Sequence, residues 1–216
     1  RMPCEPRHIE CFDNSNIQGE FPVSACVVFR DGKPSRNEYR HFNIKTVIGA
    51  DDYASMEEVV YRRYRRILEE SGPLPNLVVI DGGKGQLSSA IKALNDLELS
   101  SKISIVGIAK RLEEIYFPND SIPLYIDKRS ESLKILQQAR NEAHRFGITF
   151  HRKKRSKSSI KSKLDAVKGI GPSTQKVLLS SFKSIARLKK SDLNSIESLI
   201  GVAKAKLIWS WIKQEA

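Results

Sequence analysis

The feature that most constrains the fold is the string Leu77-Val78-Val79-Ile80-Asp81, in which four consecutive apolar side chains end at an acidic one. An uninterrupted apolar run of this length is typical of a strand buried on both faces, as in a parallel sheet covered by helices. A glycine loop, Gly82-Gly83-Lys84-Gly85, follows directly, and a helix is expected over residues 86–97. The chain should therefore contain an α/β sheet with one strand ending at Asp81.

Further strands and helices are predicted before and after this strand. Short β-branched and aromatic runs at residues 8–12, 23–29 and 37–44 predict an antiparallel meander before it. After it we expect a buried strand over residues 103–109, a small hairpin over residues 115–126, and a helix from Ser130 to about Gly147. This order predicts a mixed-sheet α/β domain.

A helix between the meander and the buried strand opens at Asp51-Asp52 and ends at about Glu70. Its 3.6-residue periodicity places the apolar side chains of Met56, Val60, Tyr64, Ile67 and Leu68 on one face. The same pattern leaves four arginines, Arg62, Arg63, Arg65 and Arg66, near solvent.

Positive charge is confined to the end of the chain. Residues 1–151 carry 21 Lys and Arg against 21 Asp and Glu, whereas residues 152–216 carry 16 against 4, which accounts for the net charge of +12. The basic run Arg152–Lys157 and the serine-rich stretch after it predict a linker at residues 154–162, between domains of residues 1–153 and 163–216. A basic domain of this kind favours a nucleic acid partner.

The second domain contains an approximate duplication. Gly169-Ile170-Gly171 and Ile200-Gly201-Val202 separate short helical segments and lie about 31 residues apart. This predicts a small all-α domain of two similar helical hairpins.

The three cysteines lack metal-ligand spacing, which fits a reducing, cytosolic interior. No stretch of 18 apolar residues and no signal-peptide pattern occurs in the sequence. We expect a soluble, cytoplasmic protein without a membrane partner.

Acidic residues at strand ends are the first candidates for chemistry. Asp13 and Asp81 follow two predicted strands, and if those strands are neighbours, both carboxylates lie at one edge of the sheet. Carboxylates that hold a divalent metal ion can support phosphodiester hydrolysis. Turn formation would also explain either residue alone, and helix capping would explain Asp51 and Asp52.

His144 shares a face of its helix with Arg140 and, beside Asp13 and Asp81, would serve as a metal ligand or a general base. A lone helical histidine is also common at ordinary surface positions. Lys84 stands in a glycine loop that lacks the spacing of a nucleotide-binding P-loop but is able to contact a DNA phosphate.

Other candidate DNA contacts lie toward the end of the chain. The basic string His151-Arg152-Lys153-Lys154-Arg155 is a candidate phosphate contact or merely a solvated charge run. The turn Gly169-Ile170-Gly171, followed by Lys176, predicts a hairpin whose amides grip a phosphate without reading bases, although an ordinary helix–helix turn also fits.

Four strings together resemble the C-terminal half of the bacterial excinuclease subunit UvrC. They are Arg7-His8-Ile9-Glu10-Cys11-Phe12-Asp13-Asn14-Ser15, Gly49-Ala50-Asp51-Asp52-Tyr53-Ala54-Ser55-Met56, Ile80-Asp81-Gly82-Gly83-Lys84-Gly85-Gln86-Leu87 and Arg140-Asn141-Glu142-Ala143-His144-Arg145-Phe146. The resemblance continues through the basic string at residues 151–155 into the first hairpin.

This resemblance implies an RNase H-like nuclease domain followed by tandem helix-hairpin-helix motifs, acting on damaged double-stranded DNA and making the 5′ incision of nucleotide excision repair. It implies that Asp13, Asp81 and His144 surround Mg²⁺ or Mn²⁺, and that Asp52 is a further catalytic acid. Arg145 and Lys84 would steady the DNA backbone. The second hairpin, around Gly201, departs from the expected Pro-Gly-Ile-Ser type of sequence.

The resemblance further implies a partnership with a UvrB–DNA complex, through a segment that we expect to lie outside this sequence. The family's nuclease domain for the 3′ incision is also expected to lie outside it. Two alternatives stay open: a non-catalytic DNA-binding scaffold, and another RNase H-like nuclease such as a junction resolvase.

Overall fold

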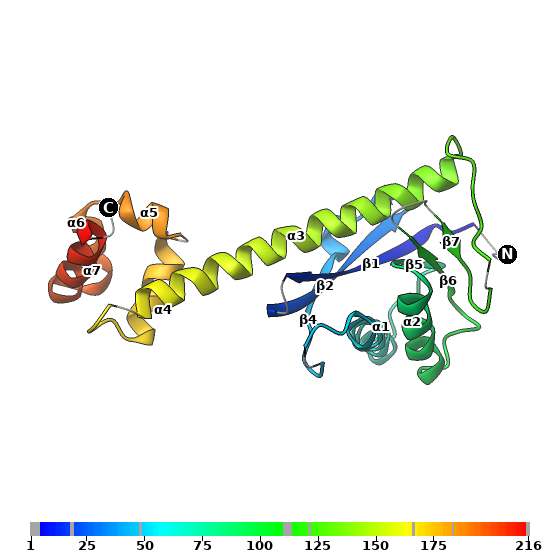
Figure 1. Ribbon diagram of the computed structural model, residues 1–216, viewed down its shortest axis with the longest axis horizontal. Coiled ribbons are helices and arrows are strands. Elements are labelled where there is room, and N and C mark those ends of the chain that lie inside the picture. Colours follow the sequence, from blue (N-terminus) through cyan, green and yellow to red (C-terminus); the bar gives the residue numbers. More distant parts are fainter. Residues whose placement is uncertain are drawn as a thin grey trace. The chain divides into compact units, whose positions relative to one another are not determined.

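The computed structural model describes residues 5–17, 20–47, 49–109, 114–120, 122–165, 167–182 and 184–214. The chain divides into two compact units, Arg1–His151 and Arg152–Ala216 (Figure 1). The first unit is built on a mixed sheet, and the second consists of helices.

Within the described residues the sheet has seven strands: β1 (His8–Ile17), β2 (Glu20–Arg30), β3 (Lys33–Pro34), β4 (Arg40–Asn43), β5 (Leu77–Asp81), β6 (Ser104–Ile108) and β7 (Ile115–Tyr116). Their order is β3-β2-β1-β5-β6-β7, with β4 also paired to β2. The three central strands β1, β5 and β6 are parallel, and the outer strands are antiparallel. The apolar run that ends at Asp81 is thus a central strand, buried along its whole length, as expected.

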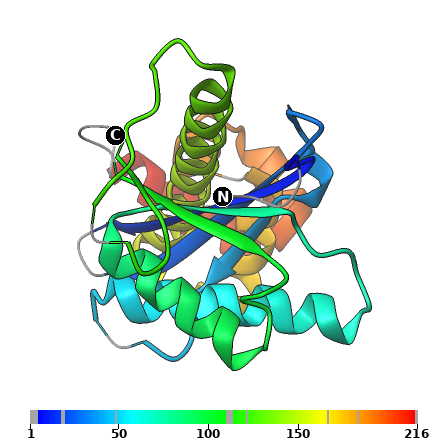
Figure 2. The same ribbon diagram turned by 90° about the vertical axis from the view of Figure 1, so that its right-hand side faces the viewer.

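Helices cover both faces of this sheet (Figures 1 and 2). The helices α1 (Asp52–Glu69) and α2 (Lys84–Asp96) pack on one face in a core that contains Phe12, Tyr64 and Ile80. The first turns of α3 (Glu131–Asp165) pack on the other face with Cys11 and Val79. Successive residues of β1 and β5 therefore point to opposite layers, as the two-residue period of a strand requires.

The helix α1 is joined to the sheet by a buried ion pair. Arg63 donates to both carboxylate oxygens of Glu10, 3.2 Å from one of them, and the Tyr64 hydroxyl lies 3.1 Å from the same carboxylate. Burial would raise the pKa of Glu10, but hydrogen bonds and positive charge from His8 and Arg63 lower that pKa to about 2. The expectation that Arg63 lies near solvent is therefore wrong, because only 14% of its side chain is exposed.

Two segments differ from the sequence-based expectation. The third extended run, predicted over residues 37–44, forms a strand at Arg40–Asn43, which is β4. Its first residues belong to a 3-10 turn at Arg36–Glu38, and the two-residue strand β3 lies before the run, at Lys33–Pro34. The helix that begins after Ser130 does not end near Gly147 but continues to Asp165, so residues 154–162 are helical. Residues 148–165 contain neither Gly nor Pro, and their Lys and Arg residues favour a helix even without an apolar stripe.

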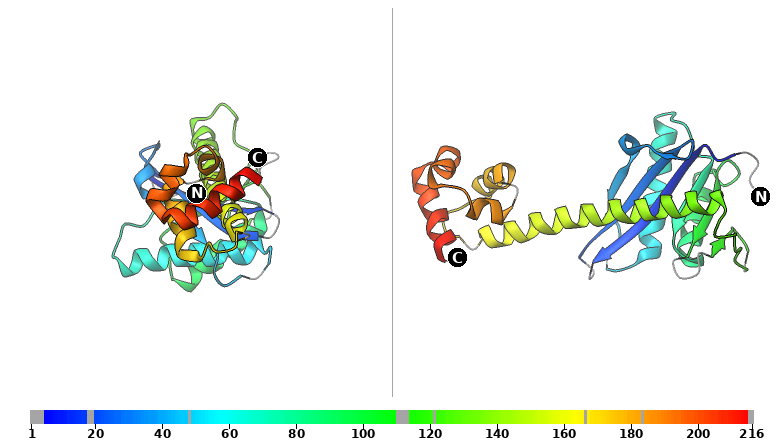
Figure 3. Two further views of the ribbon diagram at one scale, coloured as in Figure 1. Left: turned by 90° about the vertical axis from the view of Figure 1, so that its left-hand side faces the viewer. Right: turned by 90° about the horizontal axis from the view of Figure 1, so that it is seen from above.

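Among its described residues, the second unit contains the end of α3 and four short helices, which Figure 3 shows from two further directions. These helices are α4 (Pro172–Phe182), α5 (Ile185–Lys189), α6 (Leu193–Ile200) and α7 (Val202–Gln214). Ser184 caps α5 and Asp192 caps α6, each through a side-chain oxygen that accepts a backbone N–H. Their apolar faces form a separate core that includes Leu178, Ile196 and Ile208.

Candidate active site

Asp13 and Asp81 lie side by side on two parallel strands. The register pairs Phe12 of β1 with Ile80 of β5, so each aspartate follows directly after a paired position. Both belong to the sheet face that carries α3, and only 1% of Asp13 and 5% of Asp81 is exposed. The expected neighbourhood of the two strands is confirmed, although β1 does not end at Asp13 but continues to Ile17 along β2.

His144 reaches the two carboxylates from α3. Ser130 caps this helix, with its Oγ 3.2 Å from the Leu133 amide. Ala139 and Ala143 are fully buried against the sheet, and such small side chains let the helix approach closely. His144 Nδ1 consequently lies 3.2 Å from Asp13 Oδ2, and one ligand atom from each of Asp13, Asp81 and His144 lies within 4.8 Å of the others.

The charges around this cluster act on a neighbouring thiol. Burial raises the pKa of Cys11 well above its usual value, the negative charges of Asp81 and Asp13 raise it further, and the positive charge of Arg140 opposes them. The thiol of Cys11 therefore stays protonated beneath the cluster. Arg140, one helical turn before His144, contributes positive charge to the same region.

The three side chains suit a divalent metal ion. Two carboxylates buried this close together repel each other unless a cation or a proton compensates them. Carboxylate oxygens with one imidazole nitrogen are donors that Mg²⁺ and Mn²⁺ accept. The buried pair of acids, with a histidine in reach, thus fits a metal centre on the sheet face that carries α3.

Asp52 occupies a different position. Among the described residues, the group of potential ligands within 4.8 Å comprises Asp13, Asp81 and His144 and does not include Asp52. Asp52 is the first residue of α1, and its backbone carbonyl accepts a hydrogen bond of 2.8 Å from the Asn14 side chain. Asp51 is the helix cap, because its carboxylate accepts the amides of Tyr53 and Ala54 at 2.9 and 3.0 Å.

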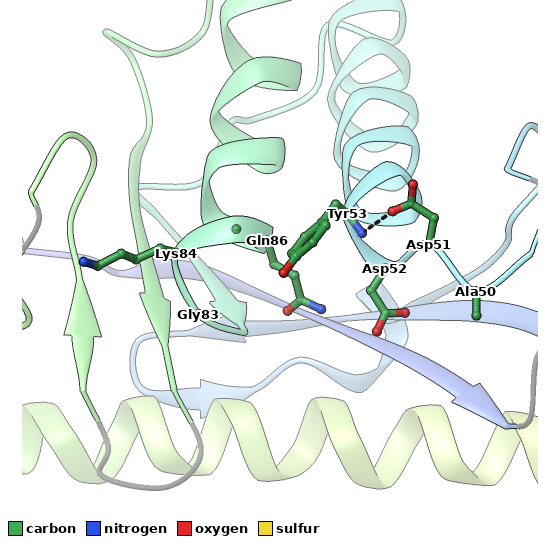
Figure 4. Close-up of a pocket in the computed structure, with 8 residues that line it drawn as sticks. Ala50, Asp51, Asp52, Tyr53, Gly83, Lys84 and Gln86 are labelled. Carbon is green, nitrogen blue, oxygen red and sulfur yellow. Dashed lines mark hydrogen bonds between the residues drawn. The ribbon is translucent and has the colours of Figure 1, made fainter.

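Asp52 lines a cleft of about 640 Å³ between the beginnings of α1 and α2 (Figure 4). Residues 50–53 form one side of the cleft, and residues 83–86 form the other. Lys84 lines it as well, but its side chain points away from Tyr53, and its Nζ lies 5.4 Å from the centre of the Tyr116 ring.

Two glycines after β5, Gly82 in the loop and Gly85 in the first turn of α2, have a packing role that the sequence did not reveal. A Cβ atom on Gly82 would collide with the side-chain amide of Gln86, and one on Gly85 would collide with the Tyr53 ring. These two glycines therefore make room for particular side chains. The sequence pattern alone indicated backbone amides that approach a phosphate.

The remaining candidates have mixed surroundings. Arg145 is exposed and ion-paired with Glu142 at 2.7 Å. Lys176 and the turn glycines are exposed, whereas Ile170 is buried in the core of the second unit, and its amide donates to Val167 at 3.2 Å. Backbone φ angles of +91° at Gly169 and +80° at Gly201 favour glycine. The side chains of His151, Arg152, Lys153, Lys154 and Arg155 are outside the described part of the chain.

The family model and the most similar relatives that we compared agree on one family. The model of the family described as "UvrC RNAse H endonuclease domain" matches residues 1–148. The chain is 65% identical over 208 residues to UvrABC system protein C of Flavobacterium psychrophilum and 55% identical over 210 residues to that of Porphyromonas gingivalis. These matches cover 96% and 97% of the chain but 35% of each relative, so the chain spans about a third of their length.

Among solved structures, Ciona intestinalis endonuclease V in complex with an inosine-containing DNA is similar, with a TM-score of 0.38 and 19% identity. That alignment covers 65% of this chain and 58% of the endonuclease. Within the described residues, no helix is long and apolar enough to cross a membrane.

Proposed function

The chain belongs to the family of UvrC RNase H endonuclease domains, and on that premise we propose that it is a metal-dependent DNA endonuclease that makes the 5′ incision of bacterial nucleotide excision repair. The observation that carries this proposal is the cluster of Asp13, Asp81 and His144 between the central strands and α3. Two buried acids with a histidine in reach are the donors that a metal-dependent phosphodiesterase needs.

Asp13 and Asp81 would hold one or two Mg²⁺ or Mn²⁺ ions. Such an ion, when bound, polarises the scissile phosphate and lowers the pKa of a water molecule. His144 then either completes the ligand set or accepts the proton of the attacking water, and in both roles its Nδ1 is oriented by Asp13. Asp52 would act on the substrate from the cleft, because it is outside the ligand cluster.

The second unit would hold the duplex. We assign residues 163–216 to a tandem helix-hairpin-helix domain that binds DNA without reading its sequence, through Gly169, Gly171, Gly201 and Lys176, with Ile170 anchoring the turn in the core. The excess charge of residues 152–216 and the basic run at residues 151–155 support this assignment. Lys84 and Arg145 would contact the backbone beside the active site.

The complete protein would act on a UvrB–DNA complex at damaged duplex in the bacterial cytoplasm. The names of the relatives, "UvrABC system protein C", support a multi-protein system of this kind.

The test is cleavage of a damaged duplex that is already nicked on the 3′ side, with the partner proteins and Mg²⁺ or Mn²⁺ supplied. The complete protein is compared with its Asp81→Asn variant and with a control, Asp96→Asn, which changes an exposed aspartate at the end of α2. We expect Asp81→Asn to abolish the 5′ cut while DNA binding persists, and Asp96→Asn to cut normally. Equal cutting by all three proteins would overturn the catalytic assignment and leave a DNA-binding module.

A further inference from the structure

The cleft between the beginnings of α1 and α2 has a ligand-sized volume and an unusual lining. Its volume of about 640 Å³ lies within the range of roughly 300 to 1,000 Å³ that is typical of small-ligand sites. Figure 4 shows the side chains of Tyr53 and Gln86 directed toward the space between the two helices, with Asp52 beside them. One aromatic ring and one amide thus face a cleft whose remaining lining comes from Ala50, Asp51, Asp52, Gly83, Lys84 and Gly85.

Tyr53 is held in the cleft and remains accessible. Its amide donates to the Asp51 carboxylate at 2.9 Å, which fixes the backbone at the start of α1. The side chain is 58% exposed, although a large apolar ring gains free energy when it is buried. An exposed ring at the mouth of a cleft is available to stack on a flat ligand.

Two glycines leave space for the Tyr53 ring and the Gln86 amide. Gly85 provides the surface against which the edge of the Tyr53 ring lies, because a Cβ at that position would meet Cζ at 2.8 Å and the hydroxyl oxygen at 3.0 Å. Gly82 makes room for the amide of Gln86 in the same way. The absence of a Cβ at these two positions therefore leaves the space that the Tyr53 and Gln86 side chains occupy.

The cleft lies on the side of the sheet that carries α1 and α2, and contacts link its walls to the residues that follow the two aspartates. Asn14, the residue after Asp13, donates to the Asp52 carbonyl at 2.8 Å. Gly82, the residue after Asp81, lies beneath the Gln86 amide. Each wall of the cleft is thus connected to the residue next to a metal-binding aspartate. A DNA strand whose phosphate is at Asp13 and Asp81 would bring a neighbouring nucleotide to the cleft.

We propose that this cleft binds one nucleotide of the strand being cut, with its base stacked on the Tyr53 ring and its edge facing the Gln86 amide. This inference rests on the proposed nuclease function and names the part of the substrate that the cleft takes, an unstacked nucleobase next to the scissile phosphate. Every base has an aromatic face, so stacking on Tyr53 tolerates any sequence, as cleavage at variable positions requires. The positive ends of α1 and α2 offset the acidic charge of Asp52.

The test uses the complete protein, carrying Asp81→Asn so that no cleavage occurs, and oligonucleotide duplexes with a single 2-aminopurine at successive positions near the incision site. Stacking on an aromatic ring changes the fluorescence of 2-aminopurine. We expect one position at which protein binding changes the signal, and loss of that change with Tyr53→Ala but not with Tyr53→Phe. The matched control is Tyr125→Ala, which removes a tyrosine of similar exposure, 60%, outside the cleft.

Affinity for a short single-stranded oligonucleotide gives a second readout. Stacking of one base is worth about 1 to 3 kcal/mol, so Tyr53→Ala should weaken binding about 5- to 150-fold, while Tyr53→Phe and Tyr125→Ala bind nearly as wild type. An unchanged fluorescence signal and affinity in Tyr53→Ala would overturn the proposal. Equal losses in Tyr53→Phe and Tyr53→Ala would also overturn it, because the hydroxyl would then be the binding group.

Failure of this proposal and failure of the proposed nuclease function are distinguishable. Both readouts measure binding and neither requires cleavage, so they respond to Tyr53 even if the metal assignment were wrong. Conversely, loss of cutting in Asp81→Asn together with normal stacking behaviour in Tyr53→Ala would retain the nuclease and remove the nucleotide subsite.

Discussion

The two units of the chain differ in what they bury and in what they expose. The first unit buries charged groups, namely Asp13, Asp81 and Glu10, within a sheet assembled from distant segments, and residues 1–151 carry balanced charge. The second unit buries mainly apolar side chains, packs short helices that are close in sequence, and carries the excess of Lys and Arg. Buried acids suit metal chemistry and exposed cations suit DNA binding, so catalysis and affinity should be separable by mutation.

The largest expected separation is at the two acids that we propose to bind the metal ion. Asp13→Asn removes one of two buried carboxylates, and we expect single-turnover cleavage by the complete protein to fall about 10³- to 10⁵-fold, because a metal ligand and a negative charge are lost together. DNA affinity, measured by fluorescence anisotropy in EDTA, should stay within about twofold of wild type.

Thermal unfolding provides an independent check of the same variant. Mn²⁺ should raise the Tm of the wild-type chain and have little effect on Asp13→Asn, because a ligand stabilises only the state that binds it. In EDTA the variant should be at least as stable as wild type, since the repulsion between Asp13 and Asp81 is relieved. A variant that is equally stabilised by Mn²⁺ would contradict the proposed metal site.

The second expected effect concerns stability of the first unit alone. Arg63→Met leaves the fully buried Glu10 carboxylate without its bidentate partner, which should lower the unfolding free energy by about 3 to 5 kcal/mol. Denaturant unfolding would measure this loss, and the double variant with Glu10→Gln should recover part of it. The control is Arg65→Met, an exposed ion pair with Glu69 on the same helix, which should change stability little.

The same pair predicts a pH dependence. The pKa of Glu10 is about 2 in the folded chain against an ordinary value of 4.5, so its contribution is fully present above about pH 4.5 and is lost as the pH falls toward 2. The wild-type chain should therefore lose more stability across this window than the double variant. Parallel pH profiles for the two proteins would contradict the assignment.

The buried ion pair between Glu10 and Arg63 also shows what could not be predicted from the sequence. A local pattern of apolar residues and helix caps was enough to predict three elements. They are the strand at residues 77–81, the capped start of α1 and the start of the helix that carries His144. The burial of Arg63 was not, since it depends on Glu10 in a strand far away in the sequence. The same periodicity placed Leu68 on the apolar face of α1, but Leu68 is 43% exposed.

The candidate site likewise depends on contacts between residues that are far apart in the sequence. Asp13 and Asp81 could be chosen as strand-end acids, but their pairing required the order of β1 and β5 in the sheet. The distance from His144 to Asp13 depends on how α3 crosses that sheet. Gly82 and Gly85 were recognisable as a loop, whereas the side chains of Gln86 and Tyr53 that they accommodate come from packing between α1 and α2.

A smaller effect is expected in the second unit. Gly169 has a φ of +91°, and a Cβ there would lie 2.9 Å from Leu207 Cδ1, so Gly169→Ala should destabilise this unit by about 1 to 2 kcal/mol. The matched control is Gly171→Ala in the same turn, where a Cβ would meet nothing within 4 Å. Amide hydrogen exchange should show faster opening of α4 and α7 in Gly169→Ala, with the strands of the first unit unaffected.

The smallest predicted effect tests where the DNA charge contacts lie. Lys176 is exposed in the first half of α4, after the turn at residues 169–171. A lysine that contacts a phosphate contributes about 0.9 to the slope of log affinity against log salt concentration. Lys176→Ala should therefore make that slope shallower by about one and weaken binding similarly on all sequences. Lys92→Ala, which removes a cation of the first unit that is paired with Glu57 at 2.7 Å, should leave the slope unchanged. A slope that responds to Lys92 and not to Lys176 would contradict the proposed roles of the two units, because the charge contacts to DNA would then lie in the first unit.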